Sequence, residues 1–249
     1  MNILRLFFLC VFLVSVPSVF ATDENKRLAK YAAKSNFISF AYKKGGKKKY
    51  GLDYELEAKK VFSSSGQSFY CYINDKYIFE VNVKGQCYTK DGQKLDRVLQ
   101  IDSYNVSGPP WEHYLDVFKE APGLYTHSPD GGAYVTYTFS FNSVKPKGRD
   151  MEISIFSGES VDGDEIDTIE TNSYFTKIQQ KGFPKESLKV DRNKVSFSQG
   201  SHSAGWAVNT ILKKGKGVIK YTYTHGGMNM VCFMVPAIPF KANVKIPKK

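Results

Sequence analysis

The sequence predicts an all-β protein, an antiparallel β-sandwich of jelly-roll type, built as one domain or as two β sub-domains with one or two short helices. Three observations predict it. Side chains alternate between apolar and polar along many short segments, turn residues separate those segments, and the 249 residues include 16 tyrosines and 18 phenylalanines. Alternation gives a strand one buried and one solvated face, and aromatic residues favour strands.

The alternating segments recur along the chain with glycine and asparagine turns between them. Spacing of this kind, with few helical patterns, is typical of sandwiches and jelly rolls. Turns of the type that joins hairpins are predicted at residues 74–75, 91–92, 130–132 and 226–227. The predicted strands are residues 52–58, 77–84, 135–141, 153–155, 219–224 and 228–235.

Two segments favour helix. Residues 22–35 carry small apolar residues at helical spacing and form either a short helix or a frayed N-terminal arm. Residues 110–121 place Trp111, Tyr114, Leu115 and Phe118 on one helical face after a proline, which suits a first turn. Residues 162–180 fit loop, strand or helix equally.

The first 21 residues have the layout of a secretory signal peptide. An apolar run follows Arg5 and ends at Pro17, and small residues precede Thr22. We expect cleavage after Ala21, a secreted extracellular protein of about 230 residues, and no transmembrane segment in it. The formal charge of +11 falls to +10 when Arg5 is lost, because residues 1–21 hold no acidic residue.

A boundary is predicted at residues 105–110, where prolines and glycine interrupt the strand pattern. It divides the mature chain into an N-terminal β sub-domain, residues 22–108 with the short leading helix, and a C-terminal β-sandwich sub-domain, residues 109–249. One domain with two packed sheets is the alternative.

Three cysteines remain after signal removal, and an odd number leaves one thiol over or forms a covalent dimer. Cys71 and Cys87 are the predicted disulfide because they are close in sequence. Cys232 lies in an apolar run and is expected to be a buried thiol.

The strongest binding signal is a lysine-rich turn. It holds five lysines around Gly45 and Gly46, and such a cluster would meet sulfated glycans or anionic lipid; a mobile tip that aids solubility is the alternative. Trp111 and Trp206 are the candidates for an aromatic platform under a sugar, although a lone tryptophan more often packs in a core. The five lysines are Lys43, Lys44, Lys47, Lys48 and Lys49.

Asn105 begins the only Asn-x-Ser/Thr sequon and is the predicted glycosylation site if the source is eukaryotic. The high positive charge does not by itself indicate nucleic acid, and the aromatic and basic motifs of single-strand binders are absent from the sequence.

No pattern for catalysis or a cofactor stands out. Residues 201–205 resemble a nucleophile elbow around Ser203, but no acidic residue follows Asp191, so a hydrolase triad lacks its later acid. The four histidines have no metal-ligand spacing. The acidic residues of 162–167 lack the register of a calcium loop and are expected to form a solvated loop.

These observations predict a secreted, non-enzymatic binding protein for an extracellular ligand, a glycan or an anionic surface, that uses no cofactor or metal. Two alternatives remain at this stage. One is a cationic, membrane-active effector of toxin type, and the other is a hydrolase whose site is assembled from distant loops.

Overall fold

The fold is taken from a computed structural model of the chain. It describes residues 38–41, 44–45, 59–61, 65–74, 76–95, 99–106, 121–127, 134–158, 161, 163–201, 204–224, 228–235 and 240–248.

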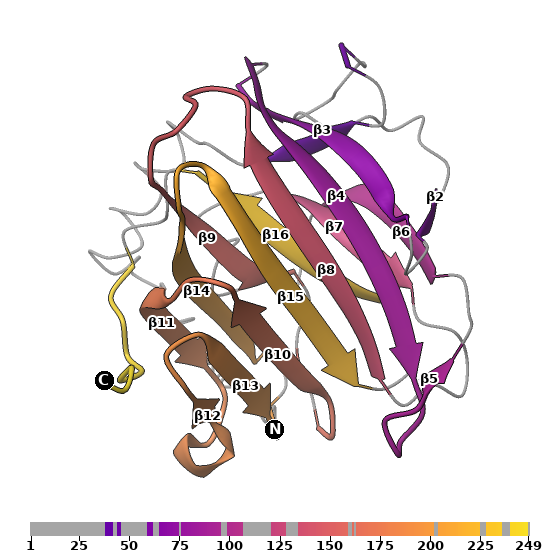
Figure 1. Cartoon of the computed structure of the whole chain (residues 1–249). Coiled ribbons are helices and arrows are strands. Elements are labelled where there is room, and N and C mark those ends of the chain that lie inside the picture. Colours follow the sequence, from indigo (N-terminus) through magenta and orange to yellow (C-terminus); the bar gives the residue numbers. More distant parts are fainter. Residues whose placement is uncertain are drawn as a thin grey trace, which may run out of the picture.

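Nine strands form the first sheet, which faces the viewer in Figure 1, and each neighbouring pair is antiparallel. In spatial order they are β1 (Ser39–Ala41), β3 (Gln67–Ile73), β4 (Lys76–Tyr88), β8 (Tyr134–Ser143), β15 (Lys216–Thr224), β10 (Ile166–Thr171), β13 (Lys194–Ser198) and β12 (Lys189–Val190), with β5 (Lys94–Leu95) paired to β4.

Seven strands form the second sheet, which is antiparallel throughout. In spatial order they are β11 (Phe175–Lys181), β14 (Gly205–Leu212), β9 (Met151–Ser157), β16 (Met228–Met234), β7 (Ala121–His127), β6 (Leu99–Val106) and β2 (Lys59–Val61). A 3₁₀ turn, η1 (Lys185–Ser187), precedes β12.

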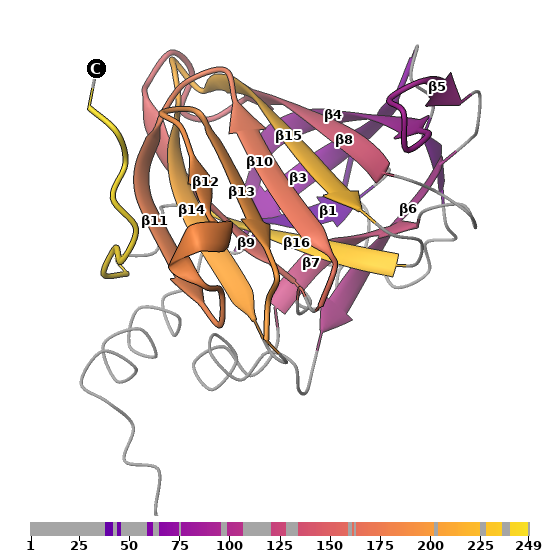
Figure 2. The same ribbon diagram turned by 90° about the horizontal axis from the view of Figure 1, so that it is seen from below.

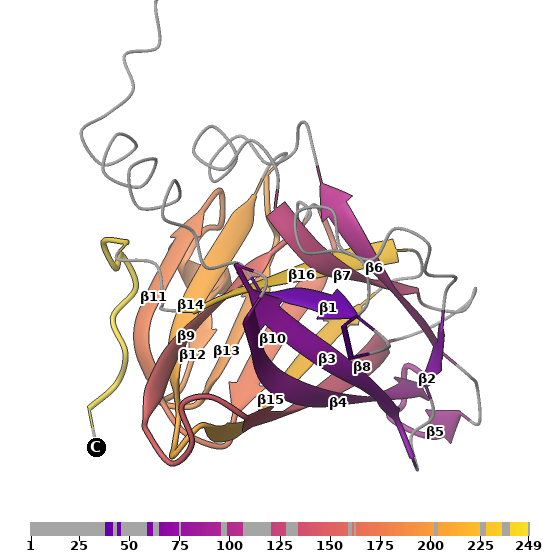
Figure 3. The same cartoon turned by 90° about the horizontal axis from the view of Figure 1, so that it is seen from above.

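The two sheets pack face to face as two layers (Figures 2 and 3), and the all-β, antiparallel sandwich predicted from the sequence is confirmed. Aromatic side chains join the layers. The Phe233 ring of β16 lies 5.1 Å from the ring of Phe139 and 5.4 Å from that of Phe141, both on β8. Edge contacts of this kind add to the burial of apolar area that holds the sheets together.

Burial follows the alternation of the sequence. Phe79, Val81 and Val83 of β4 are fully buried, and the residues between them point outward. The same alternation holds in β8 and β15, where Tyr137 and Tyr221 face the core. The predicted strands in these regions are therefore confirmed, including their inner faces.

Two predicted turns are also confirmed. At the first, Asn74 follows β3 with a φ of 47°, and the strand ends on either side, Ile73 and Lys76, are register partners, whereas residue 75 lies outside the described residues. The turn at 91–92 leads from β4 to β5, with Gly92 at a φ of 80°. The segment 162–180, which the sequence left open, contains β10 and β11.

Several predicted elements lie outside the described residues: the signal peptide, the helices at 22–35 and 110–121, the strand at 52–58, and the turns at 130–132 and 226–227. The boundary near residue 108 stays a prediction. In the described part of the chain, the blocks on either side of it share both sheets, because β4 pairs with β8 and β6 pairs with β7.

Candidate functional site

The outer face of the nine-stranded sheet carries a groove of about 640 Å³, within the size range of small-ligand sites. Strands β4, β5, β8, β15, β10 and β13 supply its lining. Because alternate residues of a strand point to one face, the register of these strands arranges the outward side chains in three rows that cross the sheet.

The first row is the charged row. It contains Lys84, Thr138, Lys220, Glu170 and Lys194, which are register partners across β4, β8, β15, β10 and β13 in that order. Lysines occupy every second strand of the row. Lys220 Nζ and Glu170 Oε1 are 3.2 Å apart, and both side chains are partly exposed, so the pair contributes at most about 1 kcal/mol to stability.

The second row is the hydroxyl row, which lies two residues from the charged row on each strand. It contains Gln86, Thr136, Thr222, Thr168 and Ser196, again as register partners. The Thr136 and Thr222 hydroxyl oxygens are 2.8 Å apart, as are those of Thr168 and Ser196. The Gln86 side-chain amide donates to two carbonyl oxygens, so it is held in place.

The third row is the aromatic row, which contains Lys94, Tyr88, Tyr134 and Thr224. The rings of Tyr88 and Tyr134 are stacked, with centroids 4.9 Å apart and planes 16° from parallel. Gly92 shapes this corner because a Cβ at that position would lie 3.2 Å from the Tyr134 hydroxyl.

The groove is positively charged. Four lysines and one glutamate are among its lining residues, a net charge of +3. Hydroxyl and amide groups can both donate and accept hydrogen bonds, and the tyrosine rings present apolar faces with a polar edge. The described lining can thus hold a polar, anionic molecule by charge, hydrogen bonds and ring contact.

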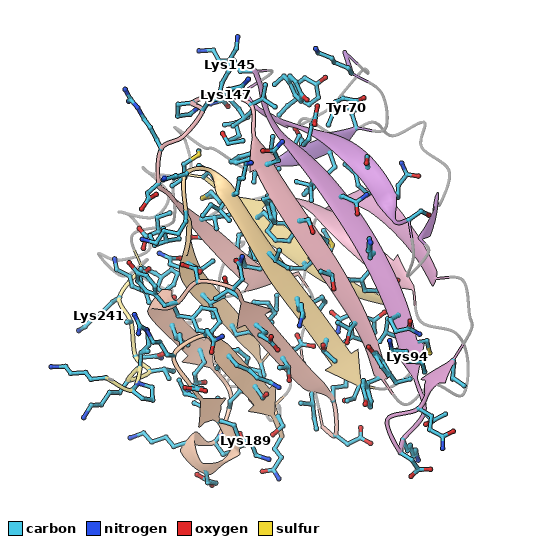
Figure 4. All side chains as sticks on the ribbon, viewed as in Figure 1. Tyr70, Lys94, Lys145, Lys147, Lys189 and Lys241 are labelled. Carbon is cyan, nitrogen blue, oxygen red and sulfur yellow. The ribbon has the colours of Figure 1, made fainter. Side chains whose placement is uncertain are left out.

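The lysine-rich turn lies away from this groove. Lys44 is its described lysine, and its Nζ stands 5.2 Å from the centre of the Tyr77 ring. Tyr77 is near the start of β4, whereas the groove contacts the end of β4. Figure 4 shows Tyr70, a ring neighbour of Tyr77, and Lys94 of the groove at opposite ends of the sheet. Lys43, Lys47, Lys48 and Lys49 lie outside the described residues.

The predicted platform at Trp206 is wrong. Its side chain is fully buried, stacks on Phe197 with ring centroids 5.6 Å apart, and donates from Nε1 to Asp167 Oδ2 at 2.7 Å. The reason is that both faces of β14 are covered near this residue, so neither is open to a ligand. Trp111 lies outside the described residues.

The predicted Cys71–Cys87 disulfide is also wrong, because both residues are present as thiols. Cys71 pairs with Phe79, and Cys87 lies eight residues further along β4. That separation is roughly 26 Å at about 3.3 Å per residue, whereas a disulfide needs Cα atoms within about 7 Å. Cys232 is a buried free thiol as expected, and burial raises the pKa of both Cys71 and Cys232.

The expectation of a solvated acidic loop is wrong at its end. Asp164 is exposed, but Asp167 is fully buried between the sheets. Within the described ranges, no three His, Cys, Asp or Glu side chains are grouped closely enough to hold a metal ion. Among the same residues, no helix is long and apolar enough to cross a membrane.

Other predicted residues are not described at the side-chain level. Ser203 lies outside the described residues, as do three of the histidines, and the fourth, His127, ends β7 without a described side chain. Asn105 is in β6, where its backbone is the register partner of Pro122, and its glycosylation stays a prediction.

Sequence reasoning missed the groove as a site. The signal was present: the tripeptide Thr-Tyr-Thr occurs at 136–138 and again at 222–224, on two strands that the structure makes neighbours. A polar outward face looks like ordinary solvated surface until the register aligns its residues.

No protein-family model matches the chain, and no curated protein shows significant sequence similarity to it. Function is therefore inferred from the residues of the groove.

Proposed function

We propose that this chain is a secreted, non-enzymatic binding protein and that it binds an extracellular glycan in the groove of the nine-stranded sheet. The observation that carries the proposal is the alignment of the charged, hydroxyl and aromatic rows within one groove. Secretion rests on the signal-like residues 1–21.

The hydroxyl row suits a sugar because sugar hydroxyls need partners that donate and accept in turn. Threonine side chains are stiff about χ1, and the Thr136–Thr222 and Thr168–Ser196 contacts fix their hydroxyls further. A ligand therefore orders few groups when it binds, which lowers the entropic cost.

The aromatic row supplies a surface for the apolar face of a sugar ring. Tyr134 and Tyr88 are only partly buried, and their mutual stacking holds both rings in place. A tyrosine contributes rigid contact area together with a hydroxyl that can hydrogen-bond.

The groove favours a glycan over a lipid surface. A planar bilayer contacts the residues that protrude most, whereas most residues of the three rows line an open groove of about 640 Å³. A chain of sugars can lie along such a groove and contact the side chains that line it. Binding to lipid, with or without insertion into the bilayer, is therefore the alternative result that the experiment must distinguish.

The experiment is a glycan array on the mature protein, followed by calorimetry with the best oligosaccharide. Thr136→Val with Thr222→Val removes two hydroxyls at nearly constant volume, and we expect at least a tenfold loss of affinity from hydrogen bonds worth about 1 kcal/mol each. Asn142→Ala is the matched control, because Asn142 is an exposed residue of β8 outside the groove lining.

A second pair of variants separates the groove from the lysine-rich turn. Replacing Lys43, Lys44, Lys47, Lys48 and Lys49 by Ser should reduce retention on heparin at low salt but leave oligosaccharide affinity within about twofold. Unchanged affinity in the double Thr variant, or leakage of anionic liposomes without any glycan binding, would contradict the proposal. Release of new reducing ends from the glycan would show an enzyme instead.

A further inference from the structure

We infer that the ligand is a linear polysaccharide with a carboxylate on every second sugar, lying across the strands above the hydroxyl row. This inference rests on the proposed function, and names the class of glycan and its direction.

The lysines of the charged row are regularly spaced across the sheet. Lys84, Lys220 and Lys194 lie in the charged row on β4, β15 and β13, with one strand between each pair of lysine-bearing strands. Strands are about 4.8 Å apart, so successive lysines of the row begin roughly 9.6 Å apart. That distance is close to the length of one disaccharide in an extended chain.

The side chains between these lysines carry no positive charge. Thr138 and Glu170 occupy the intervening strands β8 and β10. Both accept hydrogen bonds from sugar hydroxyls, but the Glu170 carboxylate repels an anionic group placed beside it. The charged row therefore favours an acidic sugar at each lysine and a neutral sugar between them.

The order of the three rows along the strands fixes which side of a bound chain faces the lysines of the charged row. The hydroxyl row lies between the charged row and the aromatic row, about 6.8 Å from each along the strands. In an extended β-linked polysaccharide, neighbouring sugars are turned over relative to one another, so carboxylates on every second sugar share one side. A chain above Thr136 and Thr222 would direct that side to the three lysines of the charged row and the other side to the aromatic row.

The ion pair does not remove Lys220 from this role. Its ammonium group has three donors, and the contact with Glu170 at 3.2 Å uses one of them. The same contact holds the Lys220 side chain in position within the row, and the exposed fraction of that side chain is 47%.

The experiment measures binding of three probes to the full mature protein by calorimetry at fixed ionic strength. Hyaluronan oligosaccharides carry a carboxylate on every second sugar, heparin oligosaccharides carry charge on nearly every sugar, and dextran is neutral. We expect hyaluronan to bind best, and affinity to rise with length until about five sugars, three of them acidic, place one carboxylate at each lysine over the roughly 19 Å from Lys84 to Lys194.

The variants test each lysine and the glutamate. Lys220→Ser or Lys194→Ser should each weaken hyaluronan binding about fivefold to tenfold, whereas Lys216→Ser, an exposed lysine of β15 outside the groove lining, should change it less than twofold. Glu170→Gln removes the repulsive charge and should raise heparin affinity relative to hyaluronan at least threefold.

The outcomes separate this inference from the proposed function. Equal or tighter binding of dextran, or an unchanged heparin-to-hyaluronan ratio in Glu170→Gln, would overturn the inference and leave glycan binding intact. Absence of binding to every glycan would overturn both, provided that thermal melts show each protein to be folded.

Discussion

Trp206 Nε1 donates a hydrogen bond of 2.7 Å to Asp167 Oδ2, and this bond joins β14 of one sheet to β10 of the other. The Asp167 carboxylate also accepts from the Tyr221 hydroxyl at 3.1 Å and from Asn229 Nδ2 at 3.5 Å. A buried carboxylate is tolerated because hydrogen bonds to the charged form replace those of water. The contact fixes the relative position of the sheets behind the groove.

Replacing Asp167 by Ala should therefore destabilise the protein by about 3–5 kcal/mol, because the Trp206 and Tyr221 donors stay buried without this acceptor. Urea denaturation followed by tryptophan fluorescence measures the change, since burial of the Trp206 indole reports on folding. Asp91→Ala, at an exposed acidic residue of the turn between β4 and β5, is the control and should shift stability by less than about 0.5 kcal/mol.

Trp206→Phe completes a double-mutant cycle. If the two residues act through their hydrogen bond, the loss in the double variant will be smaller than the sum of the single losses by about 1 kcal/mol or more. Additive losses would show that Asp167 and Trp206 stabilise the sandwich independently.

The cysteines give a second prediction. Because Cys71, Cys87 and Cys232 are buried thiols, adding reductant should leave the melting temperature of the protein unchanged. Iodoacetamide should label them only after denaturation, since burial shields them and raises the pKa of Cys71 and Cys232, which lowers the thiolate fraction. Mass spectrometry of the labelled protein counts the thiols. A drop in melting temperature on reduction would indicate a disulfide after all.

The inner faces of the strands could be predicted from the sequence, whereas the site could not. Phe79, Val81 and Tyr221 alternate with polar neighbours, and that local pattern alone determines which side of a strand is buried. The groove depends on which strands are neighbours. β4 and β8 are separated by more than forty residues in sequence, and no local pattern pairs Lys84 with Thr138.

The errors have the same physical origin. Cys71 and Cys87 are close along the chain, but an extended strand carries Cys87 far from the hairpin turn. Asp167 follows acidic neighbours and looks solvated, yet the alternation of β10 turns its side chain inward, where Trp206 meets it from the other sheet. Only tertiary contacts supply that partner.

Asp150 gives a pH-dependent prediction. Its carboxylate accepts from the Lys214 backbone N–H at 2.8 Å and from Lys213 Nζ at 3.2 Å, which pins the turn between β14 and β15. The Lys214 N–H and then the Lys213 ammonium lower the pKa of Asp150 below its ordinary value of 3.8. The carboxylate therefore stabilises the fold above that value, and the stabilisation is lost as the pH falls through the lower, folded-state pKa.

Asp150→Asn should accordingly melt at a lower temperature than the native protein at pH 7, and the difference should shrink as the pH falls below about 4. Thermal melts across this range measure it. Asp191→Asn serves as a control on a different turn, because Asp191 accepts from the Arg192 backbone N–H beside it. A difference that persists unchanged at acid pH would assign the effect to local sterics.

The C-terminal residues protect an exposed sheet edge. β11 is the last strand of the seven-stranded sheet, and residues 240–248 run beside it (Figures 1 and 2). The Asn243 side chain imitates a neighbouring strand, since its Oδ1 accepts from the Gln180 backbone N–H at 2.9 Å and its Nδ2 donates to the Gln180 carbonyl at 2.6 Å. Val244 and Ile246 pack against the core.

Removing residues 240–249 should therefore leave β11 with unpaired backbone groups that can pair with a second copy. We expect light scattering after size-exclusion chromatography to show self-association that grows with concentration. Asn243→Ala keeps the tail and should have a weaker effect than the truncation. We expect faster hydrogen exchange at the Gln180 amide and little change in the mass measured by light scattering. If the truncated protein keeps the same mass as the full chain at every concentration, the tail is not what prevents edge pairing.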